Sequence, residues 1–170
     1  ISSTTKGLEI NRRKCIIAEE ENGATSKAGV FAGGDCVTGP ATVIRAIAAG
    51  KVAAANIDEY RGIGLYKKYG YVPYDVKINE NAARTLEYAY NDWCIYQIAK
   101  GLGRPKKELD LYAKRAMNYK NLFDKETKLM RGKNKDGNFM TPFSPLKWGD
   151  AFTEGNSWHY SWSVFHDPQG

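Results

Sequence analysis

Residues 79–105, NENAARTLEYAYNDWCIYQIAKGLGRP, decide the fold class because their apolar side chains recur every three or four positions. This spacing predicts a helix over about residues 81–100, whose apolar face is formed by Leu86, Ala89, Tyr90, Trp93, Cys94 and Ile98. Gly101 and Gly103 are suited to end that helix, and Pro105 is suited to the first turn of another. The stretch therefore predicts a helical hairpin.

The helical period continues downstream of Pro105. A second helix is predicted from the apolar residues Leu109, Tyr112, Ala113, Ala116 and Leu122. After Phe123, the Asp136-Gly137 pair lies between short alternating runs, and such a pair is typical of a tight hairpin turn. We therefore expect a small β-hairpin between helices.

Aromatic rings, carboxylates and imidazoles crowd into the last part of the sequence: Trp148, Asp150, Glu154, Asn156, Trp158, His159, Trp162, His166 and Asp167. Carbohydrate sites are often built from these residue types, because aromatic faces pack on sugar C–H surfaces while carboxylates and amides bind hydroxyl groups. The cluster is therefore typical of a carbohydrate site, although spacing alone does not select Glu154 among its carboxylates as the catalytic residue. Asn156, Trp158 and His159 are the candidate substrate-binding residues.

Each of these residues also has a purely structural interpretation. Trp158 and Trp162 are four positions apart and fit a buried helix face, and a Glu in a loop is commonly solvated surface. His159 and His166 fit core histidines whose ring nitrogens are satisfied. A glycosidase needs a second carboxylate, which spacing does not identify.

Three ordered blocks resemble glycoside hydrolase family 92, the calcium-dependent exo-acting α-mannosidases: YKKYGYVPYD (66–75), residues 79–100, and WGDAFTEGNSWHYSWSVFHDPQG (148–170). The resemblance covers about residues 64–170 and implies part of an (α/α) toroid that acts on an α-mannoside. It implies that Glu154, in FTEGN, is the general acid of an inverting mechanism. The family's base and most calcium ligands are expected farther along the chain, so we expect the chain to be inactive alone.

The N-terminal segment has a different pattern. Two short apolar runs, KCIIA (14–18) and GVFA (29–32), predict strands, and residues 41–60 predict an Ala-rich helix. Gly33, Gly34 and Asp35 lie between the second strand and the helix. A glycine loop before a helix start suits phosphate or another electron-rich group, although such a turn often only joins a strand to a helix. The fold class is therefore mixed and mainly α, with a β-strand, glycine loop and helix preceding the helical hairpin.

GVFAGGDCVTGPATVIRAIAAGKVAAANIDEY (29–60) resembles the C-terminal flavin-binding stretch of pyridine-nucleotide-dependent flavoproteins of the glutamate-synthase small-subunit type. The resemblance covers about residues 5–61 and implies FAD contacts from Gly34, Asp35, Ala41, Thr42 and Val43. Asp35 would bind the ribityl chain, and the backbone N–H groups of the last three would face the isoalloxazine ring. The parts of that family that hold the rest of the cofactor have no counterpart here, so we do not expect FAD to be retained.

Composition supports a boundary near residues 61–64. Of 21 Phe, Trp and Tyr residues, 19 lie in residues 62–170, and these include all four Trp. We therefore predict two domains, a flavoprotein-like piece at 1–61 and an α-mannosidase-like piece at 62–170. The basic residues are interspersed with acidic ones rather than clustered, which argues against a nucleic-acid partner.

Other features narrow the function classes. No apolar run is long enough to span a membrane, and no targeting signal is seen at the start of the sequence. Three scattered cysteines support neither a disulfide framework nor a zinc site. Three interpretations remain: a fragment or fusion whose larger part is α-mannosidase-like, a fragment of an FAD- and NAD(P)H-dependent oxidoreductase, and a chimeric chain without function.

Overall fold

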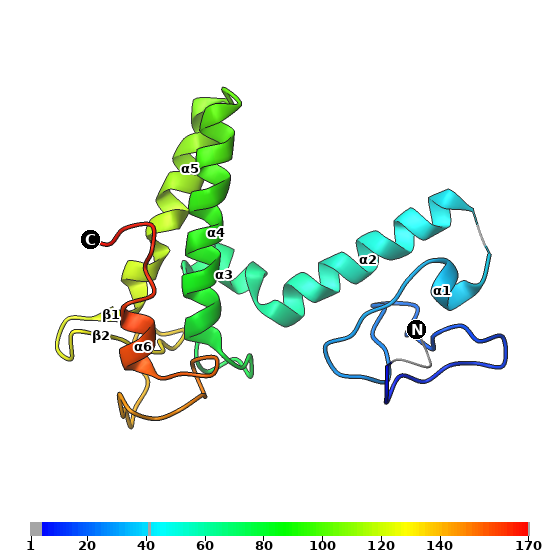
Figure 1. Ribbon diagram of the computed structural model, residues 1–170, viewed down its shortest axis with the longest axis horizontal. Helices are drawn as coiled ribbons and strands as arrows, with labels where there is room; N and C mark the ends of the chain where they lie inside the picture. The colour runs from blue at the N-terminus through cyan, green and yellow to red at the C-terminus, as the bar shows by residue number, and fades with distance from the viewer. Residues whose placement is uncertain (1–4, 41, 170) are drawn as a thin grey trace. The chain divides into compact units, whose positions relative to one another are not determined.

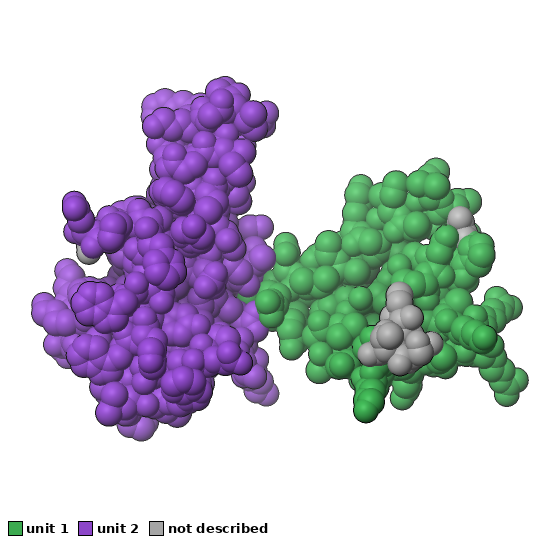
Figure 2. All heavy atoms as spheres, in the orientation of Figure 1, with its two compact units in different colours: residues 1–61 green, residues 62–170 purple. Residues whose placement is uncertain are grey.

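The computed structural model describes residues 5–40 and 42–169, and the chain divides into two compact units (Figure 2). Unit 1 comprises residues 1–61 and unit 2 residues 62–170. The regular secondary structure of the described residues is mainly helical, as predicted for the whole chain. No helix in the described ranges is long and apolar enough to cross a membrane. The assignment of unit 1 to a flavoprotein-like piece and of unit 2 to an α-mannosidase-like piece stays a prediction.

Unit 1 contains two helices, α1 (Asp35–Thr38) and α2 (Val43–Arg61) (Figure 1). The Ala-rich helix is confirmed, but the two predicted strands are reduced to isolated β-bridges, Ile10 with Ile16, Ala18 with Thr25 and Ala24 with Phe31. Such short pairings cannot propagate without a third strand and an apolar face to bury. Large apolar side chains of α2 are exposed; Ile44, for example, is 80% exposed.

Unit 2 begins with α3 (Ile63–Tyr69) and continues with the predicted hairpin, α4 (Asn81–Gly101) and α5 (Lys106–Ala116). Figure 1 shows α4 and α5 side by side. A 3₁₀ helix η1 (Met117–Leu122) follows, then the antiparallel strands β1 (Phe123–Asp124) and β2 (Leu129–Met130), and finally α6 (Ser157–Ser161). The β-hairpin turn therefore lies at residues 125–128. The Asp136-Gly137 turn closes only a bridge between Lys133 and Phe139.

The core of unit 2 lies beside the first half of α4, where Leu86 and Ala89 pack with η1, β2 and the loop before α6. Its buried members are Tyr71, Ala82, Leu86, Ala89, Tyr119, Leu122, Met130, Ala151 and Phe152. The predicted apolar face of α4 is buried only in this half, since Ile98 near the other end is exposed. The core thus fixes the start of α4 and the loop at Ala151 against each other.

A buried polar network joins α3, α4 and α5. The Tyr66 hydroxyl donates to Asp92 at 2.8 Å, and the Arg115 guanidinium lies 3.0 Å from the same carboxylate oxygen. Burial raises the pKa of the Tyr66 phenol well above its usual range, and the Asp92 hydrogen bond adds to this, so Tyr66 remains a donor. Burial also raises the pKa of Asp92, against the opposing effect of Tyr66 and Arg115. The three helices are therefore held in one arrangement.

Candidate active site

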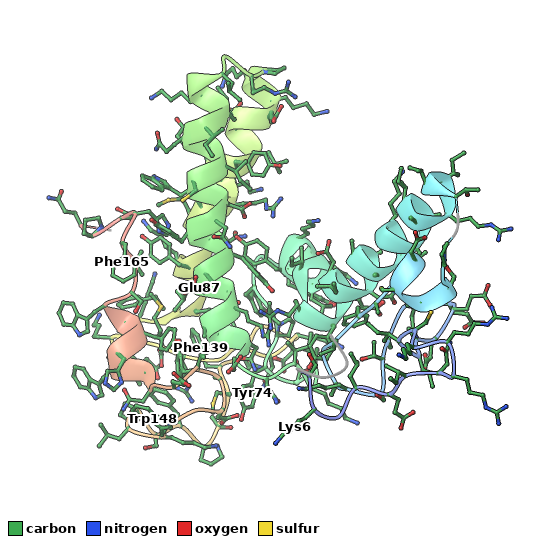
Figure 3. All side chains as sticks on the ribbon, turned by 45° about the vertical axis from the view of Figure 1, so that its right-hand side comes forward. Lys6, Tyr74, Glu87, Phe139, Trp148 and Phe165 are labelled. Carbon is green, nitrogen blue, oxygen red and sulfur yellow. The ribbon has the colours of Figure 1, made fainter. Side chains whose placement is uncertain are left out.

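A polar cleft of about 660 Å³ lies where the chain enters α4. Its walls come from two segments far apart in the sequence, one leading into α4 and one preceding α6: Tyr74, Asp75, Lys77, Ile78, Asn79, Glu80 and Asn81, with Gly149, Asp150, Phe152 and Glu154. Figure 3 shows Tyr74 at the base of α4. Four carboxylates therefore share one cleft of the size that binds small ligands.

The loop that carries Glu154 is tied to the start of α4. Its two ends meet through a 2.8 Å hydrogen bond from Gly149 N to Gly155 O. The backbone N–H groups of Ala82 and Ala83 both donate to the carbonyl of Ala151, each at 3.0 Å. First-turn N–H groups have no partner within their own helix, so the loop satisfies them. The position of Glu154 follows from this attachment.

Asp150 is clamped from two sides within the same loop. The Tyr74 hydroxyl donates to Oδ2 at 2.9 Å, and the Lys147 ammonium donates to the same oxygen at 2.6 Å. Burial and the Asp150 hydrogen bond raise the pKa of Tyr74, and the same carboxylate raises the pKa of Lys147. The Tyr74 ring itself lies against Gly132, where a Cβ would approach its Cδ2 to 2.9 Å. Asp150 therefore accepts from two groups that both keep their protons.

Backbone strain gathers at this cleft. Of the six non-glycine residues with positive φ in the described ranges, four line it: Lys77 (52°), Glu80 (60°), Asp150 (63°) and Glu154 (46°). Residues held in this region cost free energy, and their clustering is typical of functional sites. The strain therefore supports this cleft as the candidate functional site on grounds independent of its charge.

The Glu154 carboxylate is exposed, and no hydrogen bond or ion pair reaches it from the described residues. The carboxylate therefore does not lie in a dry pocket, although Trp158 and His159 follow it closely in the sequence. Asn156, Trp158 and His159 are absent from the described residues that line the cleft. Glu154 is therefore brought together with Asp150 but not, in this cleft, with the three predicted substrate-binding residues.

Trp158 and His159 belong to α6, and Asn156 is the N-cap of that helix. The Asn156 side chain accepts from His159 N while Asn156 N donates to His159 Nδ1, each at 3.3 Å, which forms a capping box. In the neutral ring this places the proton of His159 on Nε2. His159 meets Trp148 edge to face at 5.7 Å between ring centres. Trp158 is 49% exposed and Trp162 is 79% exposed, so the interpretation as a buried helix face is wrong.

His166 and Asp167 lie away from the cleft. His166 Nε2 is 2.8 Å from the carbonyl oxygen of Ala116, and the ring packs beside Tyr119. Its buried Nδ1 has no hydrogen-bond partner among the described residues, so the interpretation as a core histidine with satisfied ring nitrogens holds for Nε2 only. Asp167 accepts from the Tyr119 hydroxyl and lies 3.5 Å from the Lys120 ammonium. Asp167 is therefore separated from Glu154, whereas Asp150 shares its loop.

The glycines at the predicted flavin contacts of unit 1 have a role in packing. Gly34 has a φ of 76° and precedes α1, which starts at Asp35. A Cβ at Gly33 would approach Ala49 of α2 to 3.0 Å, so the glycine pair permits close packing on that helix. Val43 begins α2 after Thr42, and Ala41 lies outside the described residues. Contact with FAD stays a prediction.

The family resemblance implies calcium, but the described ranges contain no set of side chains that could bind it. No group of three or more His, Cys, Asp or Glu side chains there lies close enough to hold a metal ion. The carboxylates of the cleft therefore do not fit calcium by themselves, and we assign no metal ligand to them.

Removing the Tyr74 hydroxyl tests the clamp on Asp150. We expect Tyr74→Phe to speed hydrogen exchange of the loop amides of residues 149–155 by about tenfold, the loss of roughly one hydrogen bond to a charged group. Exchange measured by mass spectrometry on the 170-residue chain gives the result, with Tyr96→Phe on α4 as the matched control. Unchanged exchange in the loop would show that the clamp does not hold it.

Comparison with known proteins gives the family. The sequence model of the glycosyl hydrolase family 92 catalytic domain matches residues 28–170, and so begins inside unit 1, earlier than the expected residue 64. An uncharacterized secreted glycosidase of Arthroderma benhamiae is 37% identical over 98 residues, which are 53% of this chain and 12% of that protein. The β subunit of the NADP(+)-dependent formate dehydrogenase of Moorella thermoacetica is 47% identical over 53 residues, 31% of this chain and 8% of that subunit.

Solved structures show the same relationship. A family GH92 inverting mannosidase of Bacteroides thetaiotaomicron has a TM-score of 0.60 and 47% identity, over 64% of this chain and 14% of that chain. A family GH92 α-mannosidase of the same species has a TM-score of 0.60 and 41% identity, over 73% of this chain and 16% of that chain. The chain thus spans less than a fifth of the length of each of these relatives.

Proposed function

The chain belongs to glycosyl hydrolase family 92 over residues 28–170, and from this premise we propose that unit 2 contributes the proton donor of an α-mannosidase. The substrate class in this proposal follows the relatives whose structures are those of mannosidases. Glu154 is the proposed general acid, and the cleft beside α4 is the proposed binding site for the sugar.

The proposed chemistry uses Glu154 as a carboxylic acid. Its proton passes to the glycosidic oxygen as the bond to the anomeric carbon breaks, so that the departing sugar leaves as an alcohol. Water attacks the opposite face of the ring, activated by a base from a part of the domain that this chain does not span. No step is assigned to calcium, which in the intact family would assist at the reacting mannose.

One observation carries the proposal. Glu154 lies in the FTEGN motif, has a φ of 46°, and lines the cleft with a carboxylate that no described residue engages. Asp150, four residues earlier, is instead held by Tyr74 and Lys147. Of these two loop carboxylates, Glu154 is therefore the one available to a ligand.

A hybrid enzyme tests the proposal. In it, the matching segment of the Bacteroides thetaiotaomicron inverting mannosidase is replaced by residues 62–170 of this chain. We expect the hybrid to release mannose from an α-mannoside and the 170-residue chain alone to release none. A hybrid that melts cooperatively yet releases no mannose from any α-mannoside would contradict the proposed function.

A further inference from the structure

An aromatic surface on unit 2 lies outside the proposed active site. We call Phe123, Trp162, Val164 and Phe165 the Trp162 surface; together they line a cavity of about 560 Å³. Trp162 is 79% exposed and Phe165 74% exposed. Figure 3 shows Phe165 on the far side of α6 from Trp148. Exposed aromatic side chains gathered at one cavity mark an interaction site.

The polar rim of this cavity is mainly basic. Lys120 and Lys125 contribute ammonium groups, and Asp167 contributes the one carboxylate among the described lining residues. That carboxylate already accepts from the Tyr119 hydroxyl and lies beside Lys120. A sugar needs free acceptors for its hydroxyl protons, and this rim offers few. An apolar surface with acidic groups at its edge fits the rim better.

The family relationship indicates which part of a protein would present such a complementary surface. The solved inverting mannosidase shares the fold of this segment at 47% identity, yet the segment makes up only 14% of that chain. The remaining part of such a domain supplies many helices or strands that must bury apolar faces. We propose that the Trp162 surface packs against this remaining part of a family 92 catalytic domain, which presents apolar side chains to Trp162 and Phe165 and acidic groups to Lys120 and Lys125.

Hydroxyl-radical footprinting tests this packing in the hybrid enzyme and in the 170-residue chain. We expect oxidation of Trp162 and Phe165, followed by mass spectrometry, to be at least tenfold slower in the hybrid. Equal oxidation rates in a hybrid that melts cooperatively would overturn the proposal. The readout needs no activity, so a failure here is distinguishable from a failure of the role proposed for Glu154.

A second measurement covers the case in which the hybrid does not fold. In the 170-residue chain, Trp162→Ser with Phe165→Ser should remove at least half of the fluorescence of the apolar dye ANS, and Leu146→Ser, at another exposed apolar residue, should remove little. Equal losses would overturn the proposal. So would protection of Trp162 in this chain by methyl α-mannoside, which would assign the surface to a sugar, or protection that rises with chain concentration, which would assign it to a second copy.

Discussion

Glu154→Gln in the hybrid enzyme is expected to slow mannose release from an α-linked mannobiose by about 10²- to 10⁴-fold, the range that a positioned general acid contributes. Glutamine keeps the size of the side chain and can still donate a hydrogen bond, but it cannot transfer a proton at neutral pH. The leaving sugar would then depart as an unprotonated alkoxide. The rate of mannose release at saturating substrate measures the effect.

A control variant, Glu87→Gln, makes this loss interpretable. Glu87 is an exposed residue of α4 outside the described lining of the cleft, so Glu87→Gln should keep full activity (Figure 3). Melting curves of both variants should match the parent because neither side chain is engaged by a described residue. Activity of Glu154→Gln within threefold of the parent would remove Glu154 from the mechanism.

Asp124→Ala is expected to destabilise unit 2 by about 3 to 5 kcal/mol, the cost of breaking a buried ion pair from one side. Asp124 is only 3% exposed and lies 3.0 Å from the Arg131 guanidinium. It also accepts from Glu126 N at 3.0 Å and from the Thr127 hydroxyl at 2.9 Å. All four tryptophans lie in unit 2, so tryptophan fluorescence during urea unfolding reports on this unit.

The stabilisation by Asp124 should also depend on pH. Burial alone would raise its pKa, but the backbone N–H of Glu126, the Arg131 guanidinium and the Thr127 hydroxyl together lower it below the ordinary 3.8. The unfolded chain therefore binds the proton more readily, and acid favours unfolding. The difference between parent and Asp124→Ala should be complete above pH 3.8 and shrink as the pH falls below it. Glu126→Gln, exposed in the same turn, is the control; a difference that grows in acid would contradict the account.

Periodicity predicted the helices because a long repeat of apolar residues every three or four positions fits an amphipathic helix and does not fit a strand. The spacing in residues 81–100 identified α4, and the glycines after it marked its end. The same spacing did not show that Ile98 would be exposed, because burial depends on what packs against the helix rather than on the helix itself. The prediction of strands in unit 1 was wrong for a related reason. Short apolar runs form strands only where they can pair with other strands of a sheet, and here they form isolated bridges.

The candidate site was only partly visible in the sequence. The FTEGN motif identified Glu154, but Tyr74 and Lys77 lie 80 and 77 residues earlier in the sequence, and only folding brings them to the same cleft. The sequence also grouped Asn156, Trp158 and His159 with Glu154. In the fold these three lie at the start of α6 and do not line the cleft. The capping box between Asn156 and His159 was not visible in the sequence, because the usual pattern has Glu or Gln three residues after the cap.

The most direct test of Glu154 as general acid compares two leaving groups in the hybrid enzyme. A mannoside of 2,4-dinitrophenol needs no protonation to leave, whereas α-linked mannobiose does. Glu154→Gln should therefore lose about 10²- to 10⁴-fold on mannobiose and less than tenfold on the dinitrophenyl mannoside, measured as the rate of mannose release. Equal losses on both substrates would contradict the role of Glu154 as proton donor.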